Sequence, residues 1–252
     1  MHNPFIKLLD IIAPPLCAYC DKVLDSPSKA LCEECMQLLI PVPSPTCFHC
    51  GISARPREDE LPHNGDLCDT CMHFPPLYTQ ANAPYFYEGL LRELLPSIKY
   101  GKQEVLMHNI APLITPFAKE RILHWHDLHH ISHSILVPMP MHWFDLFRRG
   151  FSAPMILAKA IQRTLPHTTS LAPMALQKVR RTPPQASLSH AARQLNLNGV
   201  LRADATHVAE RHVILVDDVL TTGASANQAA QALKKAGASH IFVLTLARTP
   251  QA

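Results

Sequence analysis

The chain has 252 residues, a formal net charge of +3 at pH 7 and a hydrophobic content of 47%. This length allows one medium-sized domain and a small second one, and this composition supports a real hydrophobic core. No apolar run is long enough to span a bilayer, and the first residues lack the basic start and small-residue cleavage site of a signal peptide. We therefore expect a cytoplasmic protein with no transmembrane segment.

The charge is unevenly distributed along the chain. Residues 1–77 contain 5 Lys and Arg against 10 Asp and Glu, a net charge of −5, and residues 78–252 contain 18 against 10, a net charge of +8. A polyanionic partner would be attracted to the second part and not to the first. The excess is modest and far from that of a histone-like protein.

All eight cysteines precede residue 72, and they form four Cys-x-x-Cys pairs separated by 11, 11 and 17 residues. The pairs are Cys17 with Cys20, Cys32 with Cys35, Cys47 with Cys50, and Cys68 with Cys71. Each pair can present two thiolates to one metal ion, and two pairs complete a closed tetrahedral site of the structural zinc type. The sequence therefore predicts two structural Zn²⁺ sites in a small domain over residues 1–77, with zinc supplying most of its folding free energy.

Two other interpretations of the cysteines fit less well. A disulfide-rich segment does not suit a protein without an export signal, because cytosolic thiols stay reduced. A redox Cys-x-x-Cys motif usually occurs once, at a strand–helix junction. The pairing order stays open between sequential and interleaved, and we favour the sequential order because it closes short loops. His49, His63 or His73 could replace a thiolate, but with eight cysteines available they need not.

After a proline-containing linker at residues 74–77, strand and helix patterns alternate. Residues 83–87 favour a strand, and residues 90–100 favour a proline-interrupted helix that Gly101 ends. A second helix, also interrupted by prolines, is expected over residues 104–119.

Five histidines follow between residues 124 and 133. Such a tract can bind a metal, but it is more often a solvated connector, and we prefer the connector. The next elements are a short buried strand at residues 135–138 and a short helix at residues 141–147. A helix with a serine cap then covers residues 152–164.

The sequence Arg148-Arg149-Gly150 stands before that serine-capped helix. It is a candidate anion contact, and the alternative is a basic surface turn. Residues 177–185 are basic and broken by prolines, which predicts a mobile loop. A short helix at residues 189–195 and a final buried strand at residues 240–247 complete the pattern.

The most informative stretch begins at residues 213–216, whose β-branched and apolar side chains are typical of a strand buried on both faces. We expect this strand to end at two adjacent carboxylates, Asp217 and Asp218. A loop of small and hydroxyl-bearing residues then runs from Thr221 to Ser225, and residues 226–236 favour a helix.

A strand, a hydroxyl-rich loop and a helix in this order predict an anion site. The first N–H groups of the helix have no intrahelical partner and lie at the positive end of its dipole. Thr221, Thr222 and Ser225 add hydroxyl donors, and Gly223 lets the backbone approach a phosphate closely. Aspartates would repel phosphate, but they suit sugar hydroxyls or Mg²⁺ held through water. The stretch therefore matches a ribose 5-phosphate; the alternative is a helix cap with two solvated aspartates.

The alternation after residue 80 predicts an α/β fold, with an open parallel sheet and helices on both faces, over residues 78–252. Ligands bind such sheets at the carboxyl ends of the strands. The loops after Val137 and Val216 should therefore both lie at the site.

The stretch from Asp217 to Ser225 resembles the phosphoribosyl pyrophosphate (PRPP) motif of type I phosphoribosyltransferases; it is not a P-loop, because no Gly-Lys-Ser/Thr closes the turn. Other stretches accompany it in the order found in the ComF family (also called ComFC or GntX-like), across essentially the full chain. Besides the cysteine pairs, they are Ile98-Lys99-Tyr100-Gly101, Val137-Pro138-Met139-Pro140, Arg148-Arg149-Gly150-Phe151, and Arg181-Thr182-Pro183-Pro184-Gln185 with Leu188-Ser189 and Arg193. That family joins a zinc-binding segment to a type I phosphoribosyltransferase-like domain, and is implicated in DNA uptake during natural transformation and in the use of external DNA.

The resemblance implies that Asp217 and Asp218, the catalytic pair of a transferase, contact the ribose hydroxyls of PRPP, with Mg²⁺ bound alongside. The implied PRPP- and phosphate-binding set is Val219, Thr221, Thr222, Gly223, Ala224, Ser225, Lys99 and Arg149. The candidates for contacts with a DNA backbone are Lys99, Arg148, Arg149, Lys178, Arg180 and Arg181.

Two positions depart from the family pattern. Ser152-Ala153 stand where Asn-Gln usually follows Arg-Gly-Phe. Ala224 stands where a second hydroxyl is common, which removes one phosphate donor but leaves the backbone donors of the loop.

Three functions stay open. The first is a competence-type protein that handles or takes up single-stranded DNA in natural transformation, with a pocket for PRPP or a DNA phosphate. It rests on resemblance and charge, because the sequence offers no aromatic ladder for base stacking. The second is a phosphoribosyltransferase, whose acceptor the sequence does not identify. The third is a non-catalytic PRPP-binding scaffold, with the zinc segment docking a competence or helicase protein.

Overall fold

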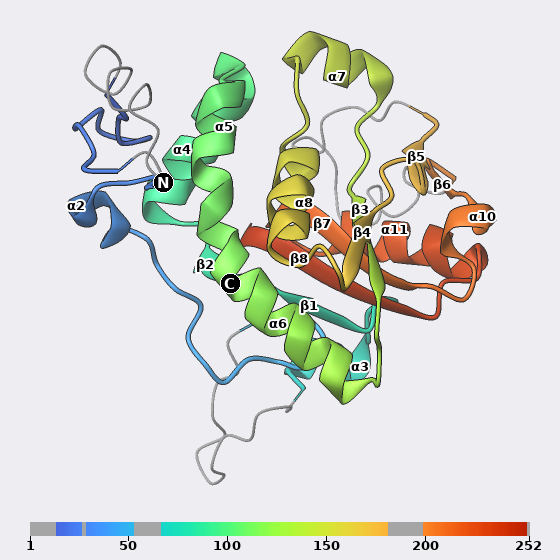
Figure 1. The fold of residues 1–252 in the computed structure, drawn as a ribbon. Helices are drawn as coiled ribbons and strands as arrows, with labels where there is room; N and C mark the ends of the chain where they lie inside the picture. Colours follow the sequence, from blue (N-terminus) through green and yellow to red (C-terminus); the bar gives the residue numbers. More distant parts are fainter. Residues whose placement is uncertain (1–13, 27–28, 53–66, 181–198, 251–252) are drawn as a thin grey trace, which may run out of the picture.

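A parallel β-sheet lies at the centre of the computed structural model, which describes residues 14–26, 29–52, 67–180 and 199–250 (Figure 1). Its strands run in the order β1-β8-β7-β3-β4, and β2 also pairs with β8. Every one of these pairings is parallel, which confirms the predicted α/β fold. The strands are β1 (Gln80–Asn82), β2 (Tyr85–Phe86), β3 (Ser134–Pro138), β4 (Thr169–Leu171), β7 (His212–Leu220) and β8 (His240–Arg248).

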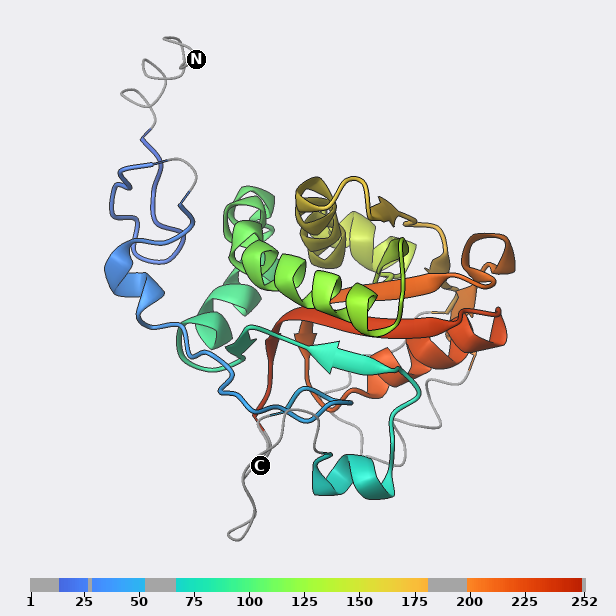
Figure 2. The ribbon, with the colours of Figure 1, turned by 60° about the horizontal axis from the view of Figure 1, so that its bottom comes forward.

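Helices cover both faces of the sheet (Figure 2). One face packs against α4 (Gly89–Gly101), α5 (Glu104–Ile110), the 3-10 helix η1 (Ala111–Ile114), α6 (Thr115–Leu128) and α8 (Ala153–Thr164). The other face packs against α10 (Ala205–Val208), α11 (Ala224–Lys235) and a hairpin of β5 (Leu176–Lys178) and β6 (Leu201–Ala203). Short helices lie outside these layers: α2 (Glu33–Met36), α3 (Asp69–His73) and α7 (Trp143–Arg149).

Alternating side chains of each strand enter the two cores. In β7, Ile214 and Val216 pack on the α6 and α8 side, whereas Val213 and Leu215 pack on the α11 side. All four are fully buried, as expected for a central strand covered on both faces.

Strand β7 is longer than predicted. The prediction that it ends at Asp217 is wrong, because the parallel ladder with β8 continues as far as the pair of Leu220 and Arg248. The two aspartates therefore lie within the strand, and β8 fixes their backbone.

The helices before β3 also differ from the prediction. Helix α4 accommodates Pro96, and it ends because Lys102, not Gly101, adopts a left-handed conformation with a φ of 54°. The second predicted helix is one rod of α5, η1 and α6, and it runs to Leu128. The strand predicted at residues 83–87 is the two-residue β2, which follows β1 closely.

The histidine tract is not the solvated connector that we preferred. His126 is buried in α6, and its Nε2 lies 2.7 Å from the hydroxyl oxygen of Ser134. The ring of His129 lies 5.0 Å from that of His240, which stacks at 5.3 Å on the ring of His212. These imidazoles form a cluster where α6 crosses the first residues of β7 and β8.

Further predictions concern the helices and the loop between residues 141 and 198. The capped helix is confirmed, since Ser152 caps α8 by accepting a bond from the N–H of Met155. The short helix α7 begins two residues later than predicted. The predicted loop is wrong at its start, because Gln177 and Lys178 pair with β6; residues 181–198, including the helix predicted at 189–195, lie outside the described residues.

None of the helices within the described ranges combines the length and the hydropathy that crossing a bilayer requires.

The histidine cluster predicts a loss of stability in mild acid. Burial lowers the pKa of His126, His129 and His212, and neighbouring histidines lower it further. The unfolded chain, with an ordinary histidine pKa of about 6.5, then binds protons more readily than the folded chain. Stability is fully present above that value and is lost as the pH falls below it. The contribution of the three histidines to the thermal unfolding midpoint should therefore be complete near neutral pH and should decline at mildly acidic pH.

A double variant separates this effect from general acid denaturation. His129→Phe with His212→Phe keeps aromatic rings in place but removes two titrating groups, so its unfolding midpoint should depend less on pH. The exposed His124 provides the control, because His124→Gln should leave the wild-type profile unchanged. Equal pH profiles for the double variant and the wild type would contradict the assignment.

Candidate phosphate site and zinc centres

The eight cysteines gather into two groups of four. One group contains Cys17, Cys20, Cys32 and Cys35, and the other contains Cys47, Cys50, Cys68 and Cys71. Within each group the sulfur atoms all lie within 4.8 Å of one another. The sequential order of pairing is therefore the observed one, and the interleaved order is excluded.

The local backbone prepares each group for a metal. The N–H of Cys32 donates to the sulfur of Cys17 at 3.4 Å, and the N–H of Cys68 donates to the sulfur of Cys47 at 3.3 Å. Such bonds favour thiolates, and a hydrogen bond from Cys50 with backbone N–H donors lowers the pKa of Cys47 to about 4. Four convergent sulfur ligands with no open position fit structural zinc.

The two aspartates of β7 have unequal surroundings. Asp218 is 7% exposed and forms an ion pair with Lys99 of α4. The N–H of Asp218 donates to a carboxylate oxygen of Asp217 at 2.9 Å. Burial, followed by the negative charge of Asp218, raises the pKa of Asp217 to about 8, although Lys99 opposes the shift. Asp217 therefore retains its proton more readily than an ordinary aspartate, and a lysine balances Asp218.

The loop after β7 leads into the first turn of α11. Gly223 adopts a left-handed conformation with a φ of 74° and directly precedes the helix. The N–H of Ala224 contacts the hydroxyl oxygen of Thr222 at 3.4 Å. Thr221, Thr222 and Ser225 are exposed, so their hydroxyl groups are accessible to a ligand. Below the loop, the side chain of Val219 packs against the core.

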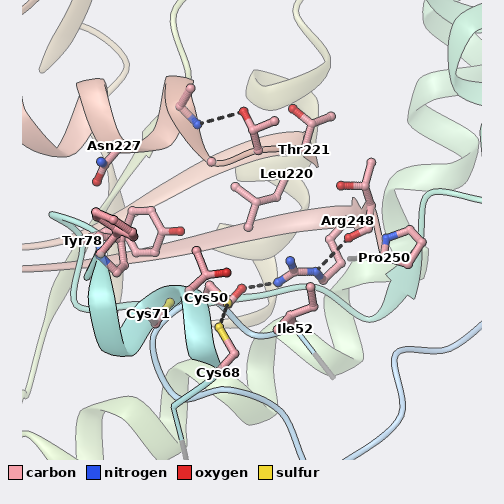
Figure 3. Close-up of a pocket in the computed structure, with 17 residues that line it drawn as sticks. Cys50, Ile52, Cys68, Cys71, Tyr78, Leu220, Thr221, Asn227, Arg248 and Pro250 are labelled. Atoms are coloured by element: carbon pink, nitrogen blue, oxygen red, sulfur yellow. Dashed lines mark hydrogen bonds between the residues drawn. The ribbon is translucent and has the colours of Figure 1, made fainter. Parts of the chain in front are cut away.

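A cavity of about 730 Å³ opens beside this loop (Figure 3). The loop residues from Leu220 to Ala224 form one wall, and Cys50, Cys68 and Cys71 of the second zinc group lie on the opposite side. The second zinc ribbon and the phosphate-type loop therefore share one cavity, although about 150 residues separate them in sequence.

Two buried side chains join the ribbon to the loop. Arg248, the last residue of β8, is 4% exposed and donates hydrogen bonds to the carbonyl groups of Cys50 and Thr249. Tyr78 is equally buried, and its hydroxyl would lie 3.2 Å from a Cβ atom placed on Gly223. The sequence analysis missed both residues. A charged residue at the carboxyl end of a buried strand was the available signal for Arg248.

Further contacts fix the ribbon and the linker to the second domain. The N–H of Leu77 donates to the side-chain oxygen of Asn227 in α11, and Nδ1 of His49 lies 2.9 Å from the carbonyl oxygen of Thr79. Gly51 passes so close to β1 that an added Cβ would lie 2.1 Å from the carbonyl oxygen of Ala81. His49 and His73 belong to neither cysteine group, and His63 lies outside the described residues.

The predicted basic contacts do not form one cluster with the loop. Arg148 and Arg149 end α7, where Arg149 contacts the sulfur of Met141 at 3.8 Å. Lys178 lies in β5 and Arg180 follows it, whereas Arg181 lies outside the described residues. Of the basic set, only Lys99 is shown beside the two aspartates.

Two family models match the chain. The double zinc ribbon domain covers residues 8–72, and the phosphoribosyl transferase domain covers residues 148–252. Competence protein F of Haemophilus influenzae is 27% identical over 236 residues, which are 92% of this chain and 96% of that protein. The chain therefore resembles the ComF family over nearly its full length.

Two further proteins similar to this chain align over most of their length. The DNA utilization protein YhgH of Escherichia coli K12 is 27% identical over 244 residues, which are 95% of this chain and 99% of that protein. The competence protein ComFC of Bacillus subtilis is 23% identical over 226 residues, or 88% and 86% of the two chains. The match to the double zinc ribbon domain agrees with the two sulfur clusters, which supports two structural zinc ions in this protein.

Two glycines provide a matched test of the docked ribbon. Gly51 and Gly150 both have a positive φ, +67° and +92°, but only Gly51 meets a neighbour, because nothing lies within 4 Å of a Cβ on Gly150. Gly150→Ala should lower the free energy of unfolding by about 1 kcal/mol, the cost of a left-handed alanine. Gly51→Ala should cost clearly more and should speed the release of zinc to a chromophoric chelator. Equal losses in chemical denaturation would show that the ribbon does not dock on β1.

Proposed function

We propose that this protein handles single-stranded DNA during natural transformation or the use of external DNA, and that its phosphoribosyltransferase domain binds PRPP or another phosphorylated ribose. The names of the relatives support the first part, since they are competence and DNA utilization proteins. One observation above all supports the second part: Asp217 and Asp218 lie in strand β7, which leads directly into the accessible hydroxyl-rich loop.

The unequal aspartates suit the hydroxyl groups of a ribose. When Asp217 holds its proton it can donate a hydrogen bond as well as accept one, and the carboxylate of Asp218, which is paired with Lys99, can accept. Thr221 to Ser225 and the first N–H groups of α11 would then hold the 5-phosphate. Lys99 would leave Asp218 to bind the pyrophosphate oxygens of PRPP, or it would contact Asp218 and the pyrophosphate at the same time.

Magnesium fits this arrangement only together with the substrate. Mg²⁺ prefers oxygen ligands and often takes one or two carboxylates, substrate phosphates and water. The two aspartates offer carboxylate oxygens, whereas the described residues show no third acidic or histidine ligand close to them. The ion would therefore arrive with PRPP and neutralise its pyrophosphate.

The two proposed domains differ in net charge and would differ in the partners they bind. We propose a zinc domain over residues 1–77, which is acidic and would dock a competence or helicase protein, and a basic phosphoribosyltransferase-like domain over residues 78–252. A cytoplasmic location accords with reduced cysteines in zinc sites.

A phosphoribosyltransferase is the second candidate function. The cavity of about 730 Å³ beside the loop has room for an acceptor, and the loop lines it, whereas Asp217 and Asp218 lie outside its lining. During transfer, Asp217 and Asp218 would lie close to the positive charge that develops on the ribose. Release of pyrophosphate from PRPP in the presence of candidate acceptors distinguishes the transferase from a binding scaffold.

Removal of the two carboxylates tests the PRPP site. We expect Asp217→Asn with Asp218→Asn to weaken PRPP–Mg²⁺ binding at least ~10-fold in calorimetry, since charge-assisted hydrogen bonds contribute about 1.5–3 kcal/mol each. The exposed Asp127 of α6 provides the control, because Asp127→Asn should bind like the wild type. Unchanged affinity in the double variant, with zinc retained, would remove the PRPP assignment.

Salt dependence tests the DNA function. The logarithm of the binding constant for an oligothymidylate should fall linearly with the logarithm of the salt concentration, by about 0.7 for each phosphate neutralised. Arg148→Gln should make this slope shallower by about that amount. Lys119→Gln, at an exposed site on α6, should not change it. A flat salt response of the wild-type protein would dismiss electrostatic DNA binding.

A further inference from the structure

Helix α7 presents bulky apolar side chains to solvent. Trp143 is 71% exposed and Phe147 is 86% exposed, and no residue of the helix is buried. The only other tryptophan, Trp125, is completely buried in the core. Exposed tryptophan and phenylalanine four residues apart on one helix face usually mark a surface that binds a partner.

Neighbouring aromatic side chains fix the orientation of Trp143 on α7. Helix α7 stands apart from the helical layers that cover the sheet (Figure 1). The imidazole of His142 lies 5.6 Å from the ring of Trp143, and Phe144 meets that ring edge-on at 5.9 Å. These contacts orient Trp143 without covering it.

Positive charge accompanies the rings. Arg148 and Arg149 end the helix, and Lys178 lies close enough to Asp145 for that carboxylate to influence its pKa. Burial lowers the pKa of Lys178, and Asp145 opposes this shift. Arg148 and Arg149 directly follow Phe147, so the positive charge stands at the carboxyl end of the helix that carries the two rings.

The topology places α7 at the functional edge of the sheet. The helix follows the carboxyl end of β3, and the phosphate-type loop follows the carboxyl end of β7, which pairs in parallel with β3. Both connections therefore leave the sheet at the same edge.

We propose that α7 is a stacking platform for single-stranded nucleic acid, on which Trp143 and Phe147 each stack with a base. Arg148 contacts the adjoining backbone phosphates. Aromatic side chains beside basic residues are the combination that binds single strands with little sequence preference. This inference rests on the proposed DNA function and names the surface that performs it.

Two other occupants fit the helix less well. Amphipathic helices that lie on membranes are commonly longer, and α7 has only seven residues, one of them Asp145. A second copy of the chain would bring Arg148 of each copy toward the same interface, where like charges repel. A nucleic acid strand meets both the rings and the arginines with complementary groups.

The two tryptophans make the test direct. An oligothymidylate should quench the emission of the wild-type protein, and Trp143→Phe should abolish the quenching while keeping most of the affinity. Trp143→Ala with Phe147→Ala should weaken binding about 10-fold or more, because each stacked base contributes substantially. The salt slope should stay unchanged, because the arginines are retained. The control is Val105→Ala, at a site that is 74% exposed on α5, which should bind like the wild type.

The outcomes separate the two proposals. A wild-type protein that binds no oligothymidylate overturns the proposed DNA function and the platform with it. Binding without quenching, and with full affinity in the double alanine variant, overturns the platform alone. The platform is also overturned if the double variant loses only its adsorption to anionic lipid vesicles, or only its self-association in sedimentation.

Discussion

The parallel pairing of β7 with β8 is the constraint on which the rest of the site depends. Its last register pair joins Leu220, where the phosphate-type loop begins, to Arg248, where the second zinc ribbon is held. A buried arginine at this point needs acceptors, and the carbonyl group of Cys50 supplies one. The ladder therefore brings the loop and the ribbon to the same cavity, and a strand shorter by two residues would separate them.

The burial of Asp217 and Asp218 is better explained by ligand binding than by a contribution to folding stability. A carboxylate loses hydration when it is buried, and an ion pair such as Lys99 with Asp218 repays that loss only in part. The pKa of Asp217 rises to about 8 in response. Two adjacent carboxyl groups, one of them with a strongly raised pKa, are typical of functional sites, because packing alone seldom selects them.

The sequence predicted those features that local pattern determines. Residues 213–216 are apolar enough to form a central strand in almost any context. The four cysteine pairs predict two metal sites, and the preference for short loops joins pairs that are adjacent in sequence. Features that depend on distant partners were missed. The ring of His129 is partly buried beside those of Trp125 and His240, and Gln177 is in a strand because Arg202 pairs with it. The exposure of Trp143 could not be predicted either, since a tryptophan in a short helix is usually buried.

The two zinc ribbons support the site of Asp217 and Asp218 through different contacts. The first ribbon packs its Cys17 and Leu31 into the same core as α4, and the hydroxyl of Tyr19 donates to Glu93 of that helix at 2.7 Å. Helix α4 carries Lys99 to Asp218. The second ribbon supports the loop through Arg248 and Tyr78. Since a ribbon of this kind folds only around its metal, zinc stabilises both the cation that faces the aspartates and the loop beside them. The ribbons are thus structural supports of the site.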